Sequence, residues 1–143
     1  MRVFLRPVIE PDLLIFYDHQ ADKEAAKMAA FPSRDKENFY LHWHKIMANA
    51  DNILLTVEVD GAVAGNVVSF MMDGVREVGY WIGREFWGRG IATTALAAFL
   101  KEVKIRPLYA HVAKTNPGSM RVLEKCGFTL LSDGDKEVVY LLG

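Results

Sequence analysis

The sequence predicts one α/β (α+β) domain over residues 1–143, with a mixed, mostly antiparallel sheet of about seven strands flanked by about four helices. Three observations lead to this fold class. Asp-Gly pairs at 60–61, 73–74 and 133–134 adjoin runs rich in β-branched and aromatic residues, as in β-hairpins. Apolar residues recur at helical spacing directly after a glycine-rich turn at residues 83–90. A chain of 143 residues is long enough to bury a core without disulfides, and its single cysteine excludes an internal one.

The first third of the chain is predicted to be one strand followed by helical segments. Arg2–Val8 alternates as a strand that Pro7 ends, and Pro11-Asp12 then opens a helix over Leu13–His19. A short amphipathic run begins at Asp22 and ends near Met28, and Ser33 opens another. Apolar and aromatic residues follow in this last helix at the spacing that buries one face, so we expect them to be core: Phe39, Tyr40, Trp43, Ile46 and Met47.

The middle of the chain is predicted to form three antiparallel strands and a helix. Ile53–Val59 and Ala62–Met71 form a hairpin, and Val75–Ile82 is the third strand. The helix begins at the glycines, and its apolar face is formed by Ile91, Ala92, Ala95, Leu96, Phe99 and Val103.

The last third predicts a strand, a helix and a hairpin. Pro107–Ala113 follows a strand-helix unit, so we expect it to lie parallel to Val75–Ile82 through a right-handed crossover. The next helix begins at its cap Asn116 and ends at Gly127. Phe128–Ser132 and Lys136–Leu142 form the final hairpin.

The turn at residues 83–90 has the features of a phosphate site. A glycine-rich loop that opens a helix directs unpaired backbone N–H groups toward open space, where an anion can approach. It is not a P-loop, since no Lys-Ser or Lys-Thr follows the glycines, and it is not a dinucleotide fingerprint, because Thr93 stands where a third Gly or Ala is needed. The alternative is a turn that only lets the helix pack closely on the sheet.

Two motifs resemble those of the Gcn5-related N-acetyltransferases (GNAT). Trp87-Gly88-Arg89-Gly90-Ile91-Ala92 is similar to the family's pyrophosphate loop, in the Trp-Gly-x-Gly-x-Ala form usual among ribosomal-protein N-terminal acetyltransferases. The segment from Asn116 to Phe128 resembles the family's Asn-x-x-Ser/Ala motif and its Lys-x-Gly-Phe ending. The resemblance covers nearly the whole chain and implies the acyl-CoA N-acyltransferase fold with acetyl-CoA as acetyl donor. The cofactor-binding residues that it implies are Trp81, Ile82, Trp87, Gly88, Arg89, Gly90, Ile91, Ala92, Thr93, Asn116 and Ser119.

The resemblance also implies catalytic roles. Glu77 is the candidate base for the amine proton, and its alternative is pairing with a surface cation or a neighbouring strand residue. Ser119 is the candidate acid or thiol hydrogen-bond donor, and its alternative is a bond to local backbone groups in the first helical turn. Leu123 occupies the position where many family members carry a tyrosine acid. The oxyanion donor is a backbone N–H near Trp81 or Ile82, which we expect a bulge at Gly79 to free from the sheet.

Other chemistry is not favoured. His42 and His44 point to different faces of a helix, so we expect solvated histidines and no metal. Cys126 ends an apolar helix face with no adjacent histidine, which favours a core thiol over a nucleophile. The net charge of −1, with both signs mixed along the chain, argues against nucleic acid, and no apolar run approaches a membrane span. We expect a cytoplasmic protein.

The function expected is therefore transfer of the acetyl group of acetyl-CoA to a primary amine, either a protein N-terminal α-amine or a small amine. A non-catalytic acyl-CoA-binding module and a structural domain without a cofactor remain as alternatives. The resemblance implies that the acceptor is set by residues 22–49 and 132–137, whose mixed charges select no single amine. The residues leave the oligomeric state open, a homodimer included.

Overall fold

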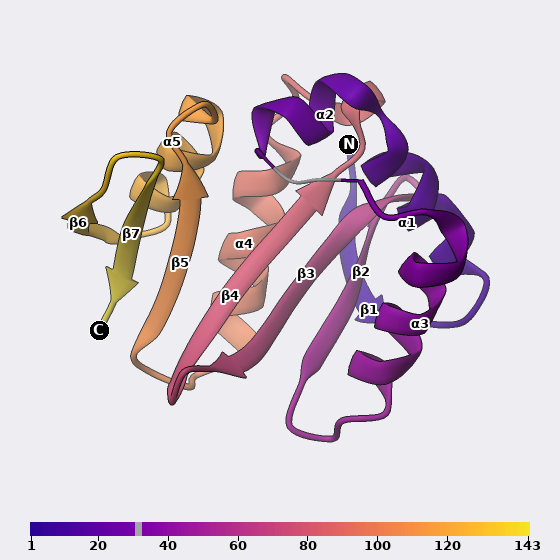
Figure 1. The fold of residues 1–143 in the computed structure, drawn as a ribbon, viewed down its shortest axis with the longest axis horizontal. Helices are drawn as coiled ribbons and strands as arrows, with labels where there is room; N and C mark the ends of the chain where they lie inside the picture. Colours follow the sequence, from indigo (N-terminus) through magenta and orange to yellow (C-terminus); the bar gives the residue numbers. More distant parts are fainter. Residues whose placement is uncertain (31–32) are drawn as a thin grey trace.

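The computed structural model describes residues 1–30 and 33–143 (Figure 1). Their elements are, in order, β1 (Val3–Pro7), α1 (Asp12–Ala21), α2 (Lys23–Met28), α3 (Lys36–Met47), β2 (Ile53–Val59), β3 (Ala62–Met72), β4 (Val75–Ile82), a 3-10 turn (Arg84–Phe86), α4 (Ile91–Glu102), β5 (Leu108–Ala113), α5 (Pro117–Lys125), β6 (Thr129–Asp133) and β7 (Glu137–Leu142).

The strands form one seven-stranded sheet in the order β1-β2-β3-β4-β5-β7-β6. Every neighbouring pair is antiparallel except β4 and β5, which are parallel. The predicted sheet, its hairpins and the parallel placement of Pro107–Ala113 beside Val75–Ile82 are confirmed. No helix in the described ranges is both long and apolar enough to cross a membrane.

The described residues form five α-helices, where about four were predicted. The short run predicted from Asp22 to near Met28 is one of them, α2, and the Asp22 side chain caps it by accepting hydrogen bonds from the backbone N–H groups of Glu24 and Ala25. α3 begins later than expected. Its cap is Asp35, whose carboxylate accepts from the N–H of Asn38 at 2.8 Å, and not Ser33.

Helices cover both faces of the sheet, as Figure 1 shows. Behind it, α4 packs Ile91, Leu96 and Phe99 against strand residues such as Val67 and Val78, all of them buried. In front, α1 and α3 form a separate aromatic cluster in which the rings of Phe16 and Trp43 lie 5.1 Å apart. This cluster contains the predicted stripe: Phe39 and Trp43 are buried, and Tyr40, Ile46 and Met47 pack against them.

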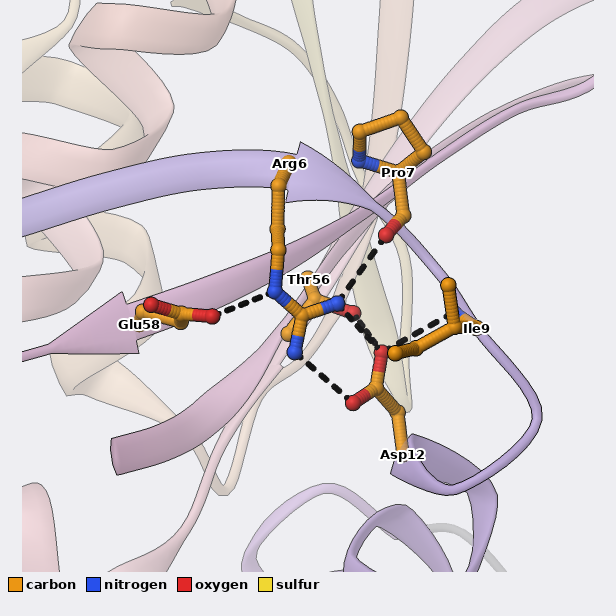
Figure 2. Close-up of polar contacts among 6 residues, drawn as sticks. All are labelled: Arg6, Pro7, Ile9, Asp12, Thr56 and Glu58. Atoms are coloured by element: carbon orange, nitrogen blue, oxygen red, sulfur yellow. Dashed lines mark hydrogen bonds and ion pairs between the residues drawn. The ribbon is translucent and has the colours of Figure 1, made fainter. Parts of the chain in front are cut away.

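A buried ion pair fixes the start of α1 to the first two strands (Figure 2). Asp12 is 2% exposed and accepts two hydrogen bonds from the Arg6 guanidinium, at 2.8 and 2.9 Å. It also accepts from the Ile9 N–H at 3.0 Å and the Thr56 hydroxyl at 2.7 Å. Arg6 is held in turn by Glu58. The front layer of helices is thereby anchored to β1 and β2.

The strands β4 and β5 pair at a single position and then diverge, as Figure 1 also shows. The only Cα partners in their register are Glu77 and Tyr109. The expected bulge at Gly79 is wrong, because β3 and β4 pair without a break from Val75 to Ile82. Divergence of the two parallel strands, and not a bulge, therefore releases one edge of β4.

Candidate active site

A cleft of about 410 Å³ lies where β4 and β5 diverge. Its walls come from the end of β4, the following loop, the first turn of α4, the start of α5 and the end of α2. The Thr115 hydroxyl donates to the Met28 carbonyl at 2.7 Å, so α2 contacts the loop that precedes α5 and the two elements bound the same cleft. Ten of the residues predicted from sequence line it: Trp81, Ile82, Trp87, Gly88, Gly90, Ile91, Ala92, Thr93, Asn116 and Ser119.

The first turn of α4 presents free amide groups to this cleft. The first hydrogen bond of the helix runs from Thr94 N–H to the Gly90 carbonyl, so the amides of Ile91, Ala92 and Thr93 precede the helical ladder. Among the described residues no side chain caps this helix, and its first turn carries no acidic residue. Such a turn favours an anion.

Two glycines give the loop its shape. Gly88 and Gly90 have φ values of 76° and 74°, in the left-handed region that glycine adopts without a steric penalty. A Cβ built at either would meet nothing within 4 Å, so both face open space rather than a packed neighbour. Close packing of helix on sheet therefore does not account for the glycines at these positions.

The free edge of β4 adds backbone groups to the cleft. Gly83 N–H donates to the Ala64 carbonyl of β3 at 2.8 Å, so odd-numbered residues of β4 pair with β3. The alternation then directs the N–H groups of Tyr80 and Ile82 toward the gap beside β5, which favours Ile82 over Trp81 as an oxyanion donor. The Ile82 carbonyl accepts from the Trp87 indole N–H at 2.9 Å.

The opposite wall is the start of α5. Asn116 caps this helix, as predicted, by accepting the N–H of Ser119 at 3.2 Å. The Ser119 hydroxyl lies 2.6 Å from the Tyr80 hydroxyl, and Tyr80 can also donate to the Ser119 carbonyl at 3.1 Å. Burial raises the pKa of Tyr80 to about 12, although the hydrogen bond with Ser119 acts in the opposite direction. At neutral pH Tyr80 is a protonated hydroxyl that orients Ser119.

Leu123, in the position of the family's usual tyrosine, has no exposed surface and belongs to the core. Tyr80 is therefore the tyrosine of this cleft, reaching Ser119 from β4 instead of α5. Tyr80 was not among the site residues predicted from the sequence. Its signal was strand alternation, which puts Tyr80 on the face opposite Glu77 and toward α4 and α5.

Glu77 lies outside the cleft lining, at the point where β4 and β5 begin to diverge. It is 3% exposed, and its Oε1 lies 3.3 Å from His111 Nε2 on β5. Burial raises the pKa of Glu77, and His111 opposes that shift only in part. A buried carboxyl with a raised pKa can accept a proton more readily than an exposed one.

Two other residues considered from the sequence, Arg89 and Cys126, do not line the cleft. The Arg89 guanidinium lies 5.8 Å from the centre of the Phe86 ring. Cys126 packs against the core and donates its thiol to the Thr93 carbonyl at 3.6 Å, and burial raises its pKa, as a structural thiol requires. Over the described ranges, no three His, Cys, Asp or Glu side chains are grouped so that they could hold a metal ion.

Comparison with known proteins identifies the family to which the chain belongs. Residues 2–129 match the model of the acetyltransferase (GNAT) domain. The chain is 29% identical over 100 residues to the Bacillus subtilis protein named "Putative ribosomal N-acetyltransferase YdaF", covering 65% of this chain and 55% of that protein. It is 25% identical over 114 residues to "Probable N-acetyltransferase YjcK" of the same organism, covering 77% and 60%. The chain thus spans less than two thirds of the length of these curated relatives.

Solved structures share the fold. A GNAT-family acetyltransferase from Bacillus anthracis superposes with a TM-score of 0.81 at 21% identity, covering 99% of this chain and 95% of that one. A spermidine N-acetyltransferase from Vibrio cholerae, solved with CoA and spermine, gives a TM-score of 0.80 at 18% identity, covering 97% and 92%.

Proposed function

The chain belongs to the acetyltransferase (GNAT) family, and from that premise we propose that it transfers the acetyl group of acetyl-CoA directly to a primary amine. The observation that carries the proposal is the uncapped first turn of α4, which opens into the cleft beside the free edge of β4. An elongated ligand with a diphosphate at one end and amides along its length is complementary to both features. Acetyl-CoA has that chemistry.

The residues present fit this ligand. The amides of Ile91, Ala92 and Thr93 would hold the diphosphate, and the free backbone groups of β4 would pair with the amides of the pantetheine arm. When bound, the thioester supplies the activated acetyl group. The N–H of Ile82 is the donor that would stabilise negative charge on the acetyl oxygen.

Two side chains would assist the reaction, one by accepting the proton of the amine and the other by donating a hydrogen bond to the sulfur. Glu77 would take the proton that the amine loses, because burial raises the affinity of its carboxylate for a proton. Ser119 would hydrogen-bond the departing sulfur, with its hydroxyl oriented by Tyr80 at 2.6 Å. A thiol pKa of about 8.5 makes the thiolate an adequate leaving group, so a hydrogen-bond donor there suffices.

The acceptor proposed is an α-amine of a protein or a small amine. An α-amine has a pKa of about 8 and a lysine side chain about 10.4, so the lysine costs roughly 3 kcal/mol more to deprotonate. A single carboxylate base is better matched to the α-amine. The matched relatives include one named as a ribosomal N-acetyltransferase and one solved with spermine, and these define the first acceptors to test.

Release of free CoA thiol tests the proposal. The purified chain is mixed with acetyl-CoA and a panel of peptides with free N-termini, polyamines and small amines, and thiol is measured with and without each acceptor. We expect at least one acceptor to stimulate release, and Ser119→Ala and Glu77→Gln to reduce it. Thr94→Ala is the control, since Thr94 lies one residue beyond the amides proposed to bind phosphate and its hydroxyl only returns to the Gly90 carbonyl.

The alternative is a non-catalytic acyl-CoA-binding module, which the core position of Leu123 favours. In that case CoA would stabilise the protein thermally, and no acceptor would stimulate thiol release. A chain that gains no thermal stability from CoA at millimolar concentration would contradict both functions.

A further inference from the structure

Three side chains, Glu77 on β4, His111 on β5 and Glu137 on β7, contact one another in a line across these strands. Glu77 Oε1 lies 3.3 Å from His111 Nε2, and His111 Nδ1 lies 3.0 Å from Glu137 Oε1. Both ring nitrogens of one histidine therefore contact a carboxylate. The three strands bring these residues together from positions 77, 111 and 137, which no spacing in the sequence indicates.

The line runs from a buried group to an exposed one. The Glu77 side chain is 4% exposed, the His111 side chain 37% and the Glu137 side chain 56%. Glu77 sits at the single pairing position of β4 and β5, directly below their divergence. On β5, Leu108, Ala110 and Val112 are buried in the core, so His111 projects from the opposite face, the face of the sheet that also carries α1 and α3.

This geometry matters for the proposed base. A proton that arrives on Glu77 has to leave before the next turnover, but the carboxyl is shielded from water. His111 is a polar side chain that contacts it and also reaches solvent. Glu137 can only accept a hydrogen bond while it is ionised, so it favours a proton on Nδ1 and leaves Nε2 directed at Glu77.

Building on the proposed acetyl transfer, we propose that His111 is the positioning residue for Glu77 and carries the amine's proton from it to solvent, with Glu137 fixing the imidazole. The N–H bond of the attacking amine breaks, and its proton passes to the Glu77 carboxylate. The resulting carboxylic acid gives the proton to Nε2 of neutral His111, which becomes an imidazolium between two carboxylates. The exposed ring then loses that proton to water, and Glu77 is again ionised.

This proton relay, from Glu77 through His111 to water, has a defined pH dependence. Burial alone would lower the pKa of His111, but the carboxylates of Glu137 and Glu77 outweigh it and raise the pKa. At any given pH His111 is thus more protonated than a free histidine, whose pKa is about 6.5, and it becomes neutral at higher pH than a free histidine does. Glu137 faces it from β7 and Glu77 from β4, and Asp73, before β4, raises the pKa of Glu77 further. Turnover should therefore rise with pH through a midpoint above that of a free histidine.

The alternative is that these residues have only a structural role and stabilise the packing of β4, β5 and β7 where β4 and β5 still pair. The two roles separate in the variant His111→Gln, which keeps hydrogen-bonding groups but carries no proton. His44→Gln is the matched control, because His44 also contacts a glutamate, Glu10, at 2.7 Å, but lies on α3 and is exposed.

The test measures kcat against pH for wild type, His111→Gln, Glu137→Gln and His44→Gln, with acetyl-CoA and the acceptor found in the thiol assay. We expect His111→Gln to lower kcat by on the order of tenfold or more and to remove the midpoint, with CoA affinity and melting temperature unchanged. Glu137→Gln should shift the midpoint downward, because one of the two carboxylates that raise the pKa is lost. His44→Gln should match wild type. In His111→Ala, added imidazole should restore part of the rate.

Several results would overturn the inference. An active wild type whose kcat and pH profile are unchanged in His111→Gln would refute the relay alone. Loss of activity together with a lowered melting temperature, without rescue of His111→Ala by imidazole, would assign the line a structural role. A wild type that no acceptor stimulates would refute the proposed function, and the relay with it.

Discussion

Replacing Asp12 by Asn should destabilise the protein strongly, because it removes the charge at the centre of the network that anchors α1. The carboxylate accepts four hydrogen bonds, two of them from the Arg6 guanidinium, and is 2% exposed. Removing one member of a buried ion pair costs about 3–5 kcal/mol. The Arg6 side chain is 22% exposed and keeps Glu58 as a partner, which places the expected loss near the lower end, about 3 kcal/mol.

Thermal and urea denaturation measure this loss. For a chain of this length the unfolding entropy is about 0.3 kcal/mol/K, so a loss of 3 kcal/mol should lower the melting temperature by roughly 10 °C. Asp35→Asn is the control, since Asp35 is an exposed helix cap and Asn caps equally well. It should change the free energy of unfolding by less than about 0.5 kcal/mol.

The effect should also depend on pH. Burial would raise the pKa of Asp12, but the bonds from Arg6, Ile9 and Thr56 outweigh it, so the pKa is lowered in the folded protein. The stabilisation is therefore complete above the unfolded pKa of about 3.9 and is lost as pH falls through the folded value. The difference between wild type and Asp12→Asn should shrink over that acidic range. A difference below about 1 kcal/mol at pH 7, or one independent of acidity, would refute the reasoning.

Three further results are expected. Gly90→Ala should weaken CoA binding in calorimetry and cost about 1–2 kcal/mol in stability, because φ at this position is 74° and a side chain there is strained; unchanged affinity would remove the loop from the cofactor site. Tyr80→Phe should lower kcat several-fold while Ser119→Ala in the same background adds little, since both changes disrupt one hydroxyl pair; additive losses would show that the two act separately. Cys126 should react with a thiol reagent only slowly in the native protein at pH 8 and rapidly in urea, because burial raises its pKa; fast native labelling would contradict its place in the core.

Local features of the sequence predicted the parts of the site that local geometry builds. Gly88 and Gly90 predict a turn with left-handed backbone angles followed by the start of a helix, and both adopt positive φ in the structure. Asn116 followed by Pro117 predicts a capped helix, and the cap forms. Each of these predictions depends on residues within one turn of the chain, so no tertiary information is required.

Features that depend on distant pairings were not predictable in the same way. The divergence of β4 and β5 depends on how two strands separated by α4 in the chain are placed beside each other, and its effect was predicted to come from a bulge at Gly79 instead. His111 becomes a partner of Glu77 only once the register that pairs Glu77 with Tyr109 is known. No local sequence pattern predicts that α2 lines the cleft, since Ala25 and Met28 fit the apolar face of any short amphipathic helix.

The divergence also has a consequence for solubility. It gives the protein an open strand border in the interior of its sheet, a feature that in other proteins invites pairing with a second polypeptide and aggregation. Here the hydrogen bond from Thr115 to the Met28 carbonyl joins the loop before α5 to the end of α2, and we expect this contact to limit access for a long foreign strand. A slender, peptide-like molecule can still enter. We therefore expect the geometry that suits the proposed cosubstrate also to limit self-association at this border.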